Sequence, residues 1–304
     1  MAISLKIKSL FYSMQGFPST LSCAEGTPGE GRTPFLTVRS DGSILRAMSD
    51  FKGSLLRVMD HKDHWAWPVF GGPTATLEQL RLHFQQEYAV YVRDFPVFLS
   101  RVHSRCPVAE VRRDLAENLY EEETGGLSGT GAHPELFLYM MEGLRLERKE
   151  FRNVKLLPES RAYRDWLDEA TTTMPWIVGA AVVTIFVEGS VHDRGAIAQH
   201  QLRPVSPEEQ EKVLLRDNPL VRYHGLDPRY LTLKRAHARV EDGHRQAAWR
   251  MVLDHARSAG EKMLVTEAVE RSLETWHTFR DGVARAAGVT RESRRSTRRL
   301  TRSS

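Results

Sequence analysis

The segment 237-HARVEDGH-244 places two imidazoles and one carboxylate where they could share a metal ion. On an α-helix, residues at i, i+4 and i+7 lie one above another on the same face. His237, Glu241 and His244 have this spacing, so their side chains point the same way. Apolar residues such as Leu233 continue the same stripe, so we expect this face to be buried.

Burial makes this motif informative, because a carboxylate in the interior costs free energy unless it is paired or bound to a metal. One interpretation is therefore a metal site. The other is a structural cluster in which His237 and Glu241 form an ordinary i, i+4 pair. The motif alone leaves both open.

A further carboxylate, Glu87, lies on an apolar stripe between Phe84 and Tyr91, with no lysine or arginine three or four residues away. It is a candidate metal ligand. The alternative is that Glu87 is buried in an ion pair with an arginine distant in sequence.

Glu123 and His133 flank the glycine-rich loop 125-GGLSGTG-131. Glycine adopts backbone conformations that other residues avoid, so this loop can bring a helix end and the next helix start to one point. Taken singly, Glu123 would belong to a solvated run of three glutamates, and His133 would be a hydrogen-bonding residue at a helix start.

Taken together, these residues suggest a metal centre shared by three or four helices. Facing helices of a bundle commonly assemble such sites, and mixed carboxylate and imidazole ligation suits iron or manganese. Zinc more typically has fewer carboxylates or some cysteine. Glu188, at the end of an apolar helix, is a candidate extra ligand, with an ordinary helix-end glutamate as the alternative.

The elements that must position these residues are helical. Apolar periodicity and start signals such as Thr76, Pro134 and Asp227-Pro228 predict the helices. They cover about 76–103, 107–123, 133–144, 160–188 with a kink at Pro175, 207–215, 228–258 and 261–287. We expect an all-α bundle over 76–288, preceded by an irregular N-terminal extension over 1–75 with a few short elements.

Composition excludes several classes. Of 304 residues 41% are hydrophobic and 27% charged, as in globular proteins, and the apolar run 176–187 is too short to span a bilayer. Two cysteines offer neither a disulfide framework nor a thiolate site. We expect no signal peptide and a cytoplasmic location.

The basic character of the chain belongs to its end. Residues 289–304 hold six arginines and one glutamate, so the remaining chain carries a net charge of about −1 out of the total of +4. We expect this arginine-rich tail to be disordered and solvated, and we expect neither a nucleic-acid nor a membrane partner.

Over residues 76–285 the chain resembles the haem-oxygenase-like di-iron oxidases and oxygenases. The strongest element is His-x3-Glu-x2-His in 237–244, where the family has His-x3-Asp-x2-His, preceded by 224-HGLDP-228. The second is 117-ENLYEEETGGLSGTGAHPELF-137, and the third is Glu87 in its aromatic-rich helix. Glu241 stands where the family has aspartate, and the extra methylene bears on how that carboxylate binds.

The resemblance implies a haem-oxygenase-like bundle of about seven helices and a site for two irons, cycling between Fe2+ and Fe3+, with manganese as an alternative metal. The implied ligands are Glu87, Glu123, His133, His237, Glu241 and His244, with Glu188 as an extra one. It further implies O2 as co-substrate. The oxidised substrate would be a small amino acid, amine or fatty acid, often in specialised-metabolite biosynthesis.

The resemblance also implies that the protein could form a homodimer. It further implies that the reaction could need an external electron donor. Two other classes stay open. A metal-free enzyme of the same bundle, of the thiaminase or pyrroloquinoline-quinone-synthase type, would not need the six ligands. A non-enzymatic interaction protein would use the arginine-rich tail.

Overall fold

The computed structural model describes residues 50–199 and 206–292, which are helical and contain no strand. The predicted all-α class is confirmed. The α-helices are α2 (Phe51–Met59), α3 (Trp67–Phe70), α4 (Leu77–Glu87), α5 (Phe95–Arg105), α6 (Ala109–Thr124), α7 (His133–Gly143), α8 (Pro158–Thr172), α9 (Trp176–Ala180), α10 (Asp193–Gln199), α11 (Pro207–Asp217), α12 (Pro219–His224), α13 (Thr232–His255) and α14 (Ala259–Ala286). The described residues also form two π-helical segments, η2 (Tyr88–Val92) and η4 (Ala181–Val187). They form two 3-10 turns as well, η3 (Arg148–Phe151) and η5 (Pro228–Tyr230).

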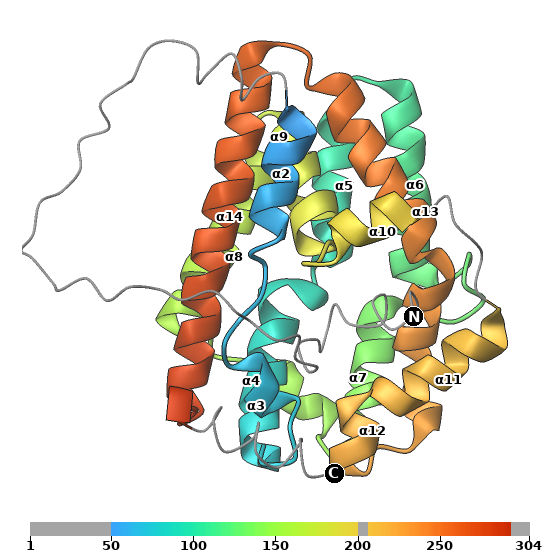
Figure 1. Cartoon of the computed structure of the whole chain (residues 1–304), viewed down its shortest axis with the longest axis vertical. Coiled ribbons are helices and arrows are strands. Elements are labelled where there is room, and N and C mark those ends of the chain that lie inside the picture. The colour runs from blue at the N-terminus through green and yellow to red at the C-terminus, as the bar shows by residue number, and fades with distance from the viewer. Residues whose placement is uncertain (1–49, 200–205, 293–304) are drawn as a thin grey trace, which may run out of the picture.

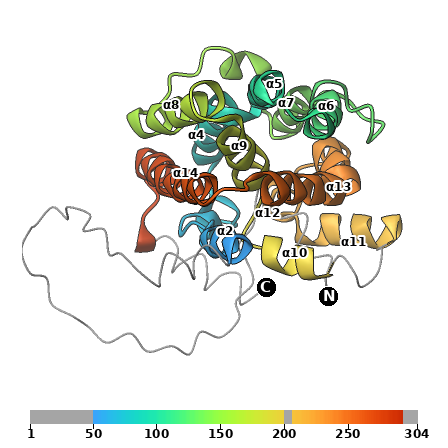
Figure 2. The same ribbon diagram turned by 90° about the horizontal axis from the view of Figure 1, so that it is seen from above.

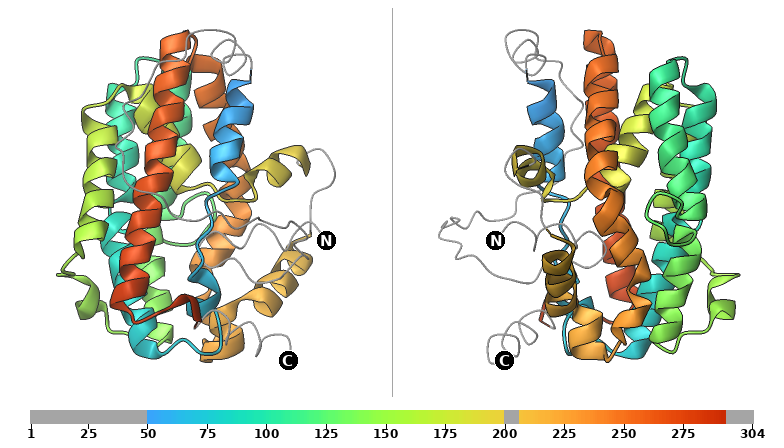
Figure 3. Two further views of the ribbon diagram at one scale, coloured as in Figure 1. Left: turned by 60° about the vertical axis from the view of Figure 1, so that its left-hand side comes forward. Right: turned by 90° about the vertical axis from the view of Figure 1, so that its right-hand side faces the viewer.

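The long helices run roughly parallel to the long axis of the molecule (Figure 1). Seen along that axis, they form three layers (Figure 2). Helices α5, α6, α7 and α8 make one outer layer, α13 and α14 the middle one, and α2, α10 and α11 the other outer one. The side views show the same arrangement (Figure 3). The middle layer therefore has neighbours on both faces, and it contributes the motif helix α13.

The centre of the bundle is the apolar segment α9–η4, which contacts α5, α8, α13 and α14. Every residue from Ile177 to Phe186 is buried, as predicted for a core helix. Pro175 does not kink one long helix but separates two. It adopts an extended conformation (ψ 145°) between α8 and α9, because its ring removes a donor and clashes with the preceding turn.

Two segments widen from α-helical to π-helical hydrogen bonding. In η2 the N–H of Arg93 donates to the Tyr88 carbonyl, and after η4 the N–H of Glu188 donates to the Val183 carbonyl, each five residues back. Such π-helical turns inside helices occur frequently at functional sites. Apolar periodicity predicted helices here but carried no signal for the extra residue in each turn.

Residues 51–70 belong to the packed bundle. Leu55 and Met59 of α2, together with Phe70 of α3, are buried in the main hydrophobic core. The predicted extension therefore contains core helices as well as irregular chain, and residues 1–49 lie outside the described part.

At the other end, Val289 is buried and the Arg291 guanidinium lies over the Trp65 ring, while residues 293–304 are not described. None of the described helices is long and apolar enough to cross a membrane.

Candidate metal centre

Helix α13 carries His237 and His244 to the wall of a cavity of about 130 Å³. Both rings are half-buried. The Nε2 atom of His244 is buried and has no hydrogen-bond partner among the described residues. A buried imidazole nitrogen of this kind suits a metal ion. Glu241 lies on the same helix, but its side chain is outside the described part of the structure.

The glycine loop brings a second pair of helices to the same cavity. Helix α6 ends at Gly125, whose φ of 64° lies in the left-handed region, and an added Cβ there would approach the backbone of Gly131 to 2.5 Å. Only glycine permits so tight a return. His133 is the first residue of α7, as predicted, and is 3% exposed.

His133 is held between two buried carboxylates. Its Nδ1 lies 2.8 Å from Glu122 Oε1, and its Nε2 lies 3.0 Å from Glu121 Oε1. Burial alone would lower the pKa of His133, but the hydrogen bonds and charges of Glu122 and Glu121 raise it. The other oxygen of Glu121 accepts from the N–H groups of Leu127 and Ser128, which anchors this carboxylate in the loop.

The carboxylates beside His133 are Glu121 and Glu122 and not Glu123. Glu122 is 7% exposed and faces the cavity, whereas Glu123 is exposed. Successive residues on a helix point about 100° apart, so a shift of one residue moves the side chain from the interior to the solvent. The structure thus places Glu122 on the cavity wall, and Glu123, the candidate from the sequence, on the exposed face of α6.

Glu122, His133 and His237 form a group that could hold a metal ion. Their ligand atoms all lie within 4.8 Å of one another. The rings of His133 and His237 meet edge to face with centroids 4.9 Å apart. Burial, and next the nearby His133, lowers the pKa of His237 well below its usual value, so His237 is neutral and available as a ligand.

Glu188 reaches the same cavity from the end of η4. The amide nitrogen of Asn118 lies 3.0 Å from one Glu188 oxygen and 3.2 Å from the other. Asn118 precedes Glu122 by one helical turn on α6, so the two carboxylates converge from different helices. The extra carboxylate suggested by the sequence therefore faces the other candidate ligands.

Glu87 has a different environment. It is 1% exposed, and its carboxylate is 3.3 Å from Arg280 Nη1, 3.1 Å from His83 Nε2 and hydrogen-bonded to Tyr91. Burial would raise the pKa of Glu87, but the Arg280 charge and the His83 hydrogen bond hold it well below its usual range. The structure thus shows the alternative that the sequence left open, a buried ion pair with a distant arginine.

The cavity also has aromatic and cationic walls. The Arg280 guanidinium lies over the rings of Trp67, Phe279 and Trp276, with centroids 4.6, 4.5 and 5.4 Å away. Lys62 donates to the carbonyls of Val187 and Gly189 at 3.1 and 2.6 Å, and burial lowers its pKa to about 7.

Lys62 and Arg280 were not predicted from the sequence as residues of the site. Asn118 and Glu121 were not predicted there either. Lys62 lay in the segment assigned to the N-terminal extension, and Arg280 lay on a helix without a motif. The π-helical segment η2 adds Tyr91 to the wall.

The donor set fits iron. Carboxylates and imidazoles without thiolates suit iron or manganese, and the lowered pKa values of His237 and His244 favour the neutral, metal-binding form. His133 shares a proton with its carboxylates, and a metal ion would replace that proton. The described residues that could hold iron are therefore Glu122, His133, Glu188, His237 and His244.

A family model described as iron-containing redox enzyme matches residues 82–277. The chain therefore belongs to this family of iron-containing redox enzymes.

Two relatives with established names match shorter stretches. The 4-aminobenzoate synthase of Chlamydia pneumoniae is 31% identical over 78 residues, 25% of this chain and 33% of that protein. That of Chlamydia trachomatis serovar D is 42% identical over 85 residues, 27% of this chain and 36% of that protein. The chain thus spans about a third of the length of these relatives.

Solved structures show the fold. A TenA homologue from Pseudomonas syringae pv. tomato has a TM-score of 0.57 at 14% identity, covering 79% of this chain and 92% of that one. A CADD-like protein of unknown function from Nostoc punctiforme has a TM-score of 0.54 at 15% identity, covering 80% and 99%. A domain of unknown function from Shewanella denitrificans, described as having a haem-oxygenase-like fold, has a TM-score of 0.53 at 12% identity, covering 82% and 94%. The chain has the haem-oxygenase-like fold.

The neighbouring glutamates provide a matched test of the site. We expect Glu122→Gln to weaken Fe(II) binding by at least about tenfold, because the amide lacks the charge that a carboxylate ligand supplies. Glu123→Gln removes the same charge from the helix surface and should bind iron like the wild type. Anaerobic titration with Fe(II), followed by metal analysis, measures both. Equal losses in the two variants, or a loss in Glu123→Gln alone, would contradict the placement.

A second pair separates ligation from stability. Glu188→Gln should lower the bound iron and leave the urea unfolding midpoint nearly unchanged. Glu87→Gln should keep iron binding but destabilise the fold by about 3 kcal/mol, because it leaves the Arg280 charge buried and unpaired. Iron loss in Glu87→Gln with normal stability would instead make Glu87 a ligand.

Proposed function

We propose that the protein is a non-haem di-iron oxidase or oxygenase, which uses O2 to oxidise a small organic substrate. The observation that carries this proposal is the group of buried Glu122 and His133 with half-buried His237, whose ligand atoms lie within 4.8 Å of one another on the wall of a cavity. Membership of the iron-containing redox enzymes supports iron as the metal.

The proposed ligands are Glu122, His133, Glu188, His237 and His244, together with Glu241 from the family motif. Bound ferrous iron would supply the electrons and the open coordination positions that O2 activation needs. Five of these six residues line the cavity, and they come from four helical segments. The protein would thus hold the metals with rigid elements on several sides.

Glu121 would orient a ligand rather than bind metal. Its carboxylate is anchored by the N–H groups of Leu127 and Ser128 and receives His133 Nε2 at 3.0 Å. This contact fixes the ring and leaves Nδ1 facing Glu122, 2.8 Å away. Carboxylates that hold the second nitrogen of a metal-binding histidine commonly orient the ring and raise its basicity.

Asn118 would orient Glu188 in the same way that Glu121 would orient His133. By donating to both carboxylate oxygens, at 3.0 and 3.2 Å, it holds the side chain toward the cavity. Lys62 is held by the carbonyls of Val187 and Gly189, on either side of Glu188, which stabilises the open end of η4.

The walls of the cavity support a substrate with an apolar body. Aromatic residues line it beside the candidate ligands, among them Trp67, Phe95, Phe137 and Trp276. We propose a small amino acid, amine or fatty acid as the substrate, oxidised in specialised-metabolite biosynthesis. The partial matches to proteins named 4-aminobenzoate synthase support a biosynthetic reaction but do not select a substrate.

If electrons beyond those of the two irons are needed, they must come from an external donor, which we propose as a partner. A homodimer and a cytoplasmic location stay predictions from the sequence. The metal-free alternative shares the fold with the TenA homologue, but it would leave the buried His244 nitrogen and the carboxylate cluster without a role.

Anaerobic loading with Fe(II), followed by O2, tests the proposal. The wild type should bind about two irons per chain and consume O2 with a transient visible absorbance. His237→Ala should lose both properties, whereas His103→Ala, which changes a histidine outside the cavity, should retain them. The experiment should be repeated with pooled amino acids, amines and fatty acids, because substrate can strengthen iron binding. Absence of bound iron under all these conditions would favour a metal-free enzyme.

A further inference from the structure

A second pocket, of about 310 Å³, opens on another side of the bundle. Its walls are η2, the loop that follows η3, and the part of α8 from Arg161 to Asp168. It shares no lining residue with the metal cavity. Four arginines line it, against a single carboxylate, Asp168; they are Arg93, Arg152, Arg161 and Arg164.

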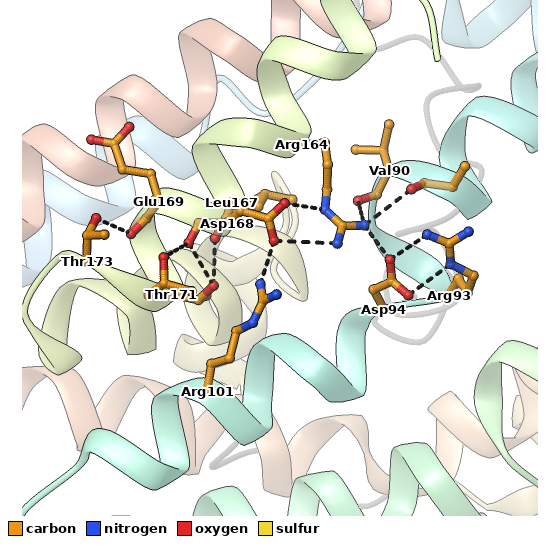
Figure 4. Close-up of polar contacts among 12 residues, drawn as sticks. Val90, Arg93, Asp94, Arg101, Arg164, Leu167, Asp168, Glu169, Thr171 and Thr173 are labelled. Atoms are coloured by element: carbon orange, nitrogen blue, oxygen red, sulfur yellow. Dashed lines mark hydrogen bonds and ion pairs between the residues drawn. The ribbon is translucent and has the colours of Figure 1, made fainter. Parts of the chain in front are cut away.

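Two of these arginines belong to a paired network (Figure 4). Arg164 donates to Asp168 Oδ2 at 2.8 Å and also to Asp94. Arg93 binds Asp94 through two nitrogens, at 2.9 and 2.7 Å, and Arg101 binds Asp168 at 2.5 Å. Three guanidinium groups therefore share two carboxylates, so this network alone already has an excess of positive charge.

The other two arginines have no counter-ion among the described residues. Arg152 and Arg161 are exposed, and neither forms an ion pair or hydrogen bond through its side chain with any residue of the described ranges 50–199 and 206–292. Asp165 lies one turn after Arg161 on α8 but makes no ion pair with it. The pocket and its network thus have three more positive than negative charges.

Like charges gathered in one hollow repel one another, and an anion that enters it relieves this repulsion. The flat guanidinium group offers paired donors that match phosphate and carboxylate oxygens.

We propose that this arginine pocket binds a small oxyanion carrying two negative charges, in the form of a phosphate ester, free phosphate or a dicarboxylate. The pocket volume suits a small molecule rather than a flat protein surface. The ligand would sit between Arg152 and Arg161, which are the two unpaired cations, while the paired arginines keep the pocket in shape.

The pocket is connected to the metal cavity through η2. Arg164 Nη1 lies 3.4 Å from the carbonyl oxygens of Ala89 and Val90, and the next two residues of η2, Tyr91 and Val92, line the metal cavity. An anion bound between Arg152 and Arg161, in a pocket that Arg164 also lines, is therefore close to the segment that forms one wall of the metal cavity.

Isothermal titration calorimetry of the full chain, at constant ionic strength with chloride as the other anion, tests the proposal. The probes are inorganic phosphate, glycerol 3-phosphate and succinate. Arg152→Gln/Arg161→Gln removes the two unpaired charges. Arg113→Gln/Arg145→Gln is the matched control, since these residues are also exposed and without a described side-chain partner elsewhere on the surface.

We expect saturable binding of at least one probe to the wild type and to the control, with affinity at least about tenfold lower in Arg152→Gln/Arg161→Gln. Binding of the two phosphates alone would identify a phosphate site, and binding of succinate alone a dicarboxylate site. The proposal is overturned if no probe saturates the wild type or if both double variants lose affinity equally. The result does not depend on iron, so it is independent of the proposed oxidase activity.

Discussion

Burial of charge in the bundle core is the constraint on which the rest of the structure depends. A carboxylate removed from water costs several kcal/mol unless a cation, a proton or a metal compensates it. In one part of the core, Arg280 and His83 compensate Glu87. In the other, Glu121 and Glu122 share the imidazole of His133, and Glu121 also accepts from the N–H groups of Leu127 and Ser128. The neighbouring His244 Nε2 has no hydrogen-bond partner among the described residues. The second arrangement is the one that a metal ion would complete.

The surrounding fold serves to bring these groups together. The left-handed Gly125 returns the chain tightly enough for α6 and α7 to present Glu122 and His133 to each other. The π-helical segments η2 and η4 lie on the cavity wall, and the end of η4 directs Glu188 toward α6, where Asn118 receives it. Helix α13, covered on both faces by other layers, supplies His237 and His244 (Figure 2).

Much of this could be predicted from the sequence, because helix periodicity, prolines and capping residues are local signals. Thr76 as a helix cap and the start of α7 at His133 are confirmed. The features that the sequence left unresolved depend on tertiary packing. Choosing Glu122 over Glu123 requires the rotation of α6 against its neighbours. The partner of Glu87 is 193 residues away along the chain, and no local pattern identifies it.

The most direct test of the central claim is a crystal structure of the iron-loaded protein with anomalous diffraction data at the iron edge. The account predicts two iron positions in the cavity, bound by Glu122, His133, Glu188, His237 and His244, with the hydrogen bond between His133 and Glu122 replaced by metal bonds. Iron bound elsewhere, or an intact bond between His133 and Glu122 in a crystal grown with excess Fe(II), would contradict it.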